Sequence, residues 1–179
     1  SAEEALAGAR DIIAEQVSED PEVRAGARRA FIAYGAFNSS ATPGREAESA
    51  KYRDYFDWEE PVGMAPSHRV LAMFRGEKEG FLKLRLGPPE NRALVPLEAL
   101  VVKGDGAAAL QVRAAVHDGY RRLLAPSMET ELRQALKKRA DEDAIAVFAL
   151  NLRQLLLAPP LGQKNVLAID PGFRTGCKV

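Results

Sequence analysis

Residues 127–157 of the chain read SMETELRQALKKRADEDAIAVFALNLRQLLL. Apolar residues recur in this stretch mostly in steps of three and four, which is the period of one buried helical face. At a rise of about 1.5 Å per residue, the predicted helix spans about 45 Å and is long enough to carry other elements along its length. The apolar set is Met128, Leu132, Leu136, Ala140, Ala144, Val147, Phe148, Leu152, Leu155 and Leu156.

Both ends of this helix have sequence signals. Pro126 and Ser127 precede Glu129 and Glu131. A hydroxyl can cap free amide groups and acidic residues suit the positive helix end, so the helix is predicted to begin at Ser127. The prolines at positions 159 and 160 cannot continue a helix and predict its end.

Composition places the chain among globular proteins with one core. Of 179 residues, 46% are hydrophobic and 28% are charged, and Lys+Arg and Asp+Glu both number 25. This balance favours a folded domain and gives no overall basic field that would draw the chain to nucleic acid. One cysteine excludes an internal disulfide, and two histidines are too few to predict a zinc cluster. We expect a cytoplasmic protein with no membrane segment and no cofactor.

The first part of the chain predicts two helices. Residues 2–17 have an amphipathic helical pattern. Asp20, Pro21 and Glu22 then supply a cap, a proline for the first helical position and an acid for the first turn. We expect a second helix from there to about residue 36, paired with the first as an antiparallel hairpin.

Residues 45–61 combine charges with aromatic residues, and two interpretations are open. Tyr52, Tyr55, Phe56 and Trp58 alternate with basic and acidic residues, as in a stacking platform for single-stranded nucleic acid. Acids outnumber bases in this segment, however, which opposes phosphate binding. Packing of the aromatic side chains in the core is therefore the favoured interpretation.

The middle of the chain predicts a small β element among helices. Residues 66–79 have a helical pattern, and residues 81–86 alternate strictly, with leucines on one side and Lys83 and Arg85 on the other. A lone strand needs a partner, and residues 37–41 are the nearest candidate. Residues 94–102 predict a short helix, and residues 107–125 predict a helix that a short link at Ala125 and Pro126 joins to the long one. The predicted fold class is a mainly α, multi-helix domain organised on one long helix, with a small β element and a truncated C-terminal strand.

The last residues change in character. Residues 166–169 form a short apolar run that predicts a buried strand, followed by Asp170 and a glycine turn. A carboxylate at such a strand can hold a metal in a two-metal phosphodiester site, but that site needs several carboxylates. Only Asp170 stands in this context, so a turn between two strands is the favoured interpretation and no catalytic residue is predicted.

Two short basic clusters are the candidate nucleic-acid contacts. If the two helices that carry them are neighbours, the clusters could form one phosphate-contacting patch. The three acids at positions 141–143 could instead neutralise the second cluster through pairs one turn apart. The candidate residues are Arg121, Arg122, Lys137, Lys138 and Arg139.

Several stretches resemble the family of the bacterial transcription accessory protein Tex, in the order in which the family has them. The resemblance implies that residues 1–162 are the helical central domain of a Tex-like protein. It also implies that residues 163–179 are a linker and the first strand of a truncated RNase H-like (YqgF) module, in which Asp170 would be a metal ligand only if the module were complete. The stretches are GREAE at 44–48, RDYF at 53–56, PSHR at 66–69, FRGE at 74–77, ETEL at 129–132, residues 149–159 and IDPGFRTG at 169–176.

The resemblance implies a role linked to RNA or DNA and to transcription in the longer protein. The expected function of this chain is a helical scaffold, without enzymatic activity, that positions the RNA- and DNA-binding modules of that protein. Two alternatives remain open: direct nucleic-acid binding through the basic clusters, and a fragment of a metal-dependent RNase H-like nuclease.

Overall fold

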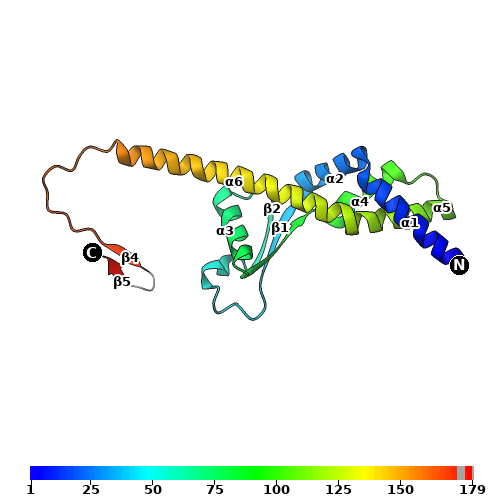
Figure 1. The fold of residues 1–179 in the computed structure, drawn as a ribbon, viewed down its shortest axis with the longest axis horizontal. Helices are drawn as coiled ribbons and strands as arrows, with labels where there is room; N and C mark the ends of the chain where they lie inside the picture. The colour runs from blue at the N-terminus through cyan, green and yellow to red at the C-terminus, as the bar shows by residue number, and fades with distance from the viewer. Residues whose placement is uncertain (173–175, 179) are drawn as a thin grey trace. The chain divides into compact units, whose positions relative to one another are not determined.

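A computed structural model describes residues 1–172 and 176–178 of the chain. The chain divides into two compact units, Ser1–Ile145 and Ala146–Val179, and each is described by itself. Its elements are mainly helices with a small antiparallel sheet, which confirms the predicted fold class (Figure 1). In chain order they are α1 (Ala2–Glu19), α2 (Pro21–Tyr34), β1 (Ala36–Ala41), the 3-10 helix η1 (Ala50–Tyr55), β2 (Asp57–Pro61), α3 (Ser67–Lys78), β3 (Leu82–Gly87), α4 (Glu90–Val101), α5 (Ala107–Gly119), the π-helical turn η2 (Tyr120–Leu124), α6 (Ala125–Leu156), β4 (Asp170–Gly172) and β5 (Gly176–Lys178).

The two N-terminal helices form where the sequence predicts them. The side chain of Asp20 accepts hydrogen bonds from the N–H groups of Glu22 and Val23, at 2.8 and 2.9 Å, and so caps α2. The predicted hairpin is only part of the packing, because α1 lies mainly along α5 and α2 lies mainly along α4 (Figure 1). Helices from later in the chain therefore supply the main packing partners of both N-terminal helices.

The long helix begins earlier than predicted. Residues 107–156 are helical throughout, so the predicted link at Ala125 and Pro126 is wrong. In a regular α-helix the ring of Pro126 would clash with the carbonyl group one turn before it. The π turn immediately before the proline, where the N–H group of Ala125 donates to the carbonyl oxygen of Tyr120, widens the helix at that point. This turn explains how the helix passes the proline.

Only the first half of the predicted apolar face of α6 is buried. Met128, Leu132, Leu136 and Ala140 belong to the core of the unit Ser1–Ile145. The other members of the predicted face are exposed, with Phe148 at 67% as an example. Helical periodicity identifies the face that can be buried, but burial also requires a neighbouring element. None of the described residues covers Ala144, Val147, Phe148, Leu152, Leu155 or Leu156.

The sheet has the strand order β2-β1-β3, with β1 antiparallel to both neighbours. The pairing of β1 with β3, in which Phe37 lies opposite Leu86, confirms the predicted partner of the alternating strand. β2 was not predicted, because its acidic residues have low strand propensity. The aromatic residues around β2 pack against the core, as the favoured interpretation predicted. Tyr52 is buried, and the rings of Tyr55 and Trp58 meet edge to face with centroids 6.3 Å apart.

The free edge of β3 is bonded to α6. The N–H group of Leu86 donates to the carboxylate of Glu129 at 3.1 Å, and the guanidinium group of Arg133 donates to the carbonyl oxygen of Leu84 at 2.8 Å. These backbone groups would otherwise be open to pairing with another strand. The long helix therefore fixes the position of the sheet with polar side chains as well as through its buried face.

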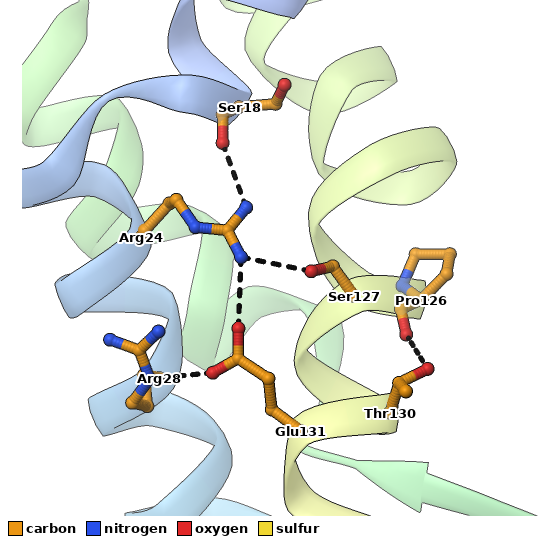
Figure 2. A network of polar contacts seen from close by, with 7 residues as sticks. All are labelled: Ser18, Arg24, Arg28, Pro126, Ser127, Thr130 and Glu131. Atoms are coloured by element: carbon orange, nitrogen blue, oxygen red, sulfur yellow. Dashed lines mark hydrogen bonds and ion pairs between the residues drawn. The ribbon is translucent and has the colours of Figure 1, made fainter.

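A second polar network fixes α6 to α2 (Figure 2). The guanidinium group of Arg24 donates to Ser127 Oγ and Glu131 Oε1, both at 3.0 Å, and also to the carbonyl oxygen of Ser18 at 3.2 Å. Arg28 Nε donates to Glu131 Oε2 at 2.8 Å. Both oxygens of one carboxylate are thus bound by arginines of the neighbouring helix.

In the unit Ala146–Val179, β4 and β5 form a two-stranded antiparallel hairpin. The strand begins at Asp170 and not at residue 166, because Val166, Leu167 and Ile169 lie outside any strand and are exposed. A buried strand of that composition needs strands or helices on both faces, and the described residues supply none for it. The turn predicted at Asp170 and Gly172 is wrong, because both residues belong to strand β4. Residues 173–175 lie outside the described residues.

Candidate nucleic-acid interface

The first basic cluster lies on the π turn and is paired with acids of three helices. Arg121 Nε donates to Glu90 Oε1 at 2.5 Å. Arg122 Nη2 lies 2.8 Å from Asp118 Oδ2 and 3.2 Å from Asp11 Oδ1. The hydrogen bond with Glu90 raises the pKa of Arg121. Both guanidinium groups are charged, and their charge is balanced by nearby carboxylates.

The second cluster is neutralised by acids one turn further along α6, as the sequence allowed. Lys137 pairs with Asp141, and Lys138 Nζ lies 3.9 Å from Glu142 Oε1. Arg139 turns toward the protein and donates to the carbonyl oxygen of Ala65 at 3.0 Å. Arg139 therefore holds the loop before α3, and the two lysines have acidic neighbours on an exposed helix face.

The two clusters do not form one patch. A single patch would require the clusters to lie on two neighbouring helices, but Arg122 and Lys137 lie on one uninterrupted helical run, 15 residues apart. At about 1.5 Å per residue, that separation is about 22 Å along the axis. Each cluster is thus a separate group of two or three bases with acids beside it, which gives little of the counterion release that drives binding to a phosphate backbone.

The structure also forms a polar surface that the sequence did not predict, on the outer side of the three-stranded sheet. It surrounds a hollow of about 450 Å³. Asn38 lies between Arg85 and Glu59, and Ser40 lies between Lys83 and Asp57. We call this surface, which consists of Asn38, Ser40, Asp57, Glu59, Lys83 and Arg85, the sheet face.

The charges of the sheet face cancel. Its two bases lie on β3 and its two acids on β2, about 10 Å away across β1. The strict alternation of residues 81–86 predicted that Lys83 and Arg85 share one side of a strand. Nothing in the sequence predicted the acids opposite them, because β2 was not recognised as a strand.

Asp170 does not lie in a metal-binding arrangement. Its backbone pairs with that of Lys178 in the β4-β5 hairpin, and its side chain is exposed. Within residues 1–172 and 176–178, no three His, Cys, Asp or Glu side chains are grouped so that they could hold a metal ion. A two-metal site requires several convergent carboxylates, so the donor set of the described residues does not fit one.

His117 takes part in a structural contact between two helices. His117 Nε2 lies 2.5 Å from Glu98 Oε1, and Arg113 Nε donates to the other oxygen of Glu98 at 3.1 Å. This is a structural ion-pair group between α4 and α5.

In the part of the chain that the structure describes, no helix combines the length and apolar character needed to cross a membrane.

Fold and surface together define a mainly helical module in which carboxylates or a backbone carbonyl oxygen bind the five bases of the two clusters. Residues 1–148 match the family model described as Tex central region-like, and the chain belongs to this family. It is 41% identical to protein YdcI of Bacillus subtilis and 39% identical to the transcriptional accessory protein Tex of Neisseria gonorrhoeae, in each case over 99% of this chain. A shorter stretch, 36% of this chain, is 36% identical to the human S1 RNA-binding domain-containing protein 1, of which it covers 6%.

The chain is short relative to these proteins. It spans 25% of the length of the Bacillus protein and 24% of the Neisseria protein. The family match confirms the resemblance inferred from the sequence. The assignment of residues 163–179 to an RNase H-like module stays a prediction.

Proposed function

We propose that this chain is a helical scaffold that holds the nucleic-acid-binding parts of a longer transcription accessory protein at fixed positions, and that it has no catalytic activity of its own. The names of two relatives, a transcriptional accessory protein and an S1 RNA-binding domain-containing protein, support the link to transcription and RNA. Since the chain matches only about a quarter of the longer relatives, the parts that bind nucleic acid in them can lie elsewhere.

The observation that carries the scaffold proposal is the attachment of one helix to several elements by polar contacts. Along α6, Glu131 binds α2, Glu129 binds β3, and Arg133 Nη1 binds Glu77 of α3 at 2.6 Å. Further along, Asp143 accepts a hydrogen bond from Ser67 at the start of α3. Contacts distributed in this way restrain rotation and sliding of the helix, which is what a spacer between domains requires.

The paired charges support the proposal against direct binding. The five candidate bases are engaged by carboxylates or a backbone carbonyl, and the sheet face carries equal numbers of acids and bases. A surface of this kind has no excess positive charge to exchange for condensed counterions.

Fluorescence anisotropy of the chain with labelled single-stranded RNA and with duplex DNA tests this function. The scaffold proposal predicts no titratable binding at low salt. Binding that weakens steeply with salt and is lost in the variant R121A/R122A/K137A/K138A would overturn it in favour of direct phosphate contact.

A matched control separates the basic clusters from a general loss of charge. The variant R29A/R53A/K78A/K103A removes the same charge from exposed positions on other parts of the unit Ser1–Ile145. If both variants lose binding equally, the contact is an unspecific effect of net charge. If only the first loses it, the clusters are the interface.

A further inference from the structure

A groove between α3 and α6 lies on the exposed side of the long helix and has a volume of about 590 Å³. Phe74 of α3 lines it on one side. On α6 it is lined by Arg133, whose charge is paired with Glu77 and Glu129, and by six further residues. The six are spaced three, one, three, one and three positions apart, which is one helical face about three turns long. These residues are Gln134, Lys137, Lys138, Asp141, Glu142 and Ile145. We call this surface the α3–α6 groove.

Apart from Arg133, the α6 side of the groove is antisymmetric in charge about a midpoint between Arg139 and Ala140. Reversing the direction of the helix about this point exchanges Lys137 with Glu142 and Lys138 with Asp141. It also exchanges Gln134 with Ile145. In a two-fold symmetric contact between identical chains, the same surface of each chain meets its reversed copy. Here the reversed copy places an opposite charge against each of these four charges.

We propose that the α3–α6 groove binds a second copy of this chain, with the two α6 helices antiparallel across a two-fold axis at residues 139 and 140. In this arrangement Lys137 and Lys138 of each copy lie opposite Glu142 and Asp141 of the other. Four ion pairs form between the copies. Contact is restricted to about three turns, because packed helices commonly cross at an angle of about 50° and then diverge.

Apolar burial in this dimer comes from the ends of the groove. Ile145 is 66% exposed and lies opposite Gln134 of the second copy. Phe74 is next to that position, because its ring lies 5.9 Å from the guanidinium carbon of Arg133. Ile145 of each copy therefore reaches the half-buried ring of Phe74 in the other, and the contact occurs twice.

The charges of the groove favour a second copy over nucleic acid. Arg133, Lys137 and Lys138 are matched by Glu77, Asp141 and Glu142, so the lining has no net charge to attract a polyanion. The ion pairs that Lys137 and Lys138 form within α6 do not prevent them from pairing with a second copy. Exposed pairs one turn apart contribute little stability, and their members can share the carboxylates of a second chain.

Sedimentation of the 179-residue chain over a range of concentrations is the first measurement, followed by two charge reversals, K137E/K138E and D141K/E142K. Each variant alone places like charges opposite each other across the two-fold axis. Dimerisation should weaken at least about tenfold in each. An equimolar mixture restores all four opposite-charge pairs between unlike chains and should dimerise as the parent does.

Two controls keep the result specific. R29E/K103E changes the net charge as K137E/K138E does, at exposed positions of the same unit, and should dimerise normally. Circular dichroism of every variant checks that the helices remain folded. The proposal would be overturned if the parent chain is a monomer. It would also be overturned if both charge-reversal variants associate as the parent does, since exposed apolar residues such as Phe148 would then drive the association. Loss in both variants with recovery in the mixture would support it.

Discussion

At the scale of single residues, Arg133 joins three elements through one guanidinium group. It binds Glu77 of α3 at 2.6 Å, Glu129 of α6 at 2.9 Å and the carbonyl oxygen of Leu84 in β3 at 2.8 Å, and its side chain is 25% exposed. Arg133→Ala should lower the free energy of unfolding by about 2 kcal/mol, because two half-buried carboxylates and an edge carbonyl lose their donor. Urea denaturation followed by circular dichroism measures this, and Arg29→Ala, on an exposed site, should change it by less than about 0.5 kcal/mol.

Glu98 gives a pH dependence at the same scale. Its hydrogen bond with His117, with a further contribution from Arg113, lowers the pKa of this carboxyl below the ordinary 4.5. The folded state therefore binds the proton less readily than the unfolded state. The stability that Glu98 contributes is complete above pH 4.5 and is lost as the pH falls below that value through the lowered pKa.

Replacement of this carboxylate should flatten the acid side of the stability curve. Glu98→Gln should have a lower free energy of unfolding than the parent at pH 7, and the two proteins should converge as the pH falls below 4.5. Urea midpoints at three pH values measure the slope. Glu3→Gln, on the exposed start of α1, should keep the slope of the parent, and an unchanged slope in Glu98→Gln would contradict the assignment.

At the scale of elements, α1 and α5 approach each other closely at Gly119. A β-carbon at this position would lie 3.0 Å from the backbone oxygen of Ala14 and 3.3 Å from its β-carbon. Gly119→Ala should therefore destabilise the protein by about 1–3 kcal/mol, because backbone atoms must move apart. Gly8→Ala is the matched control, since nothing lies within 4 Å of a β-carbon there. It should stabilise α1 by up to about 1 kcal/mol, and thermal melting of both variants tests the opposite signs.

At the scale of the whole molecule, the residues that the structure shows as buried all precede Ala146. The core of the unit Ser1–Ile145 ends at Ala140, and residues 146–171 and 176 are exposed. A fragment of residues 1–145 should fold by itself and keep the free energy of unfolding within about 1 kcal/mol of the full chain, because no core contact is removed. Chemical denaturation of both chains measures this. A fragment that fails to fold would show that residues 146–179 contribute to the core.

The sequence by itself determined the elements whose signals are local. Asp20 and Pro21 mark the start of α2, and the alternation of residues 81–86 marks β3 and identifies its two exposed bases. The periodic apolar residues from Met128 identify α6. Caps, turns and periodicity depend on a few neighbouring residues, so they can be recognised without knowledge of the fold.

The tertiary structure decided what depends on contacts between distant segments. Only the structure shows that α6 continues from α5 past Pro126, that Val147 and Phe148 remain exposed, and that β2 pairs with β1. The same holds for the candidate site, where the bases could be identified from the sequence but their neutralisation by Glu90 and Asp11 could not. Burial and ion pairing are properties of two surfaces that meet, and one stretch of sequence describes only one of them.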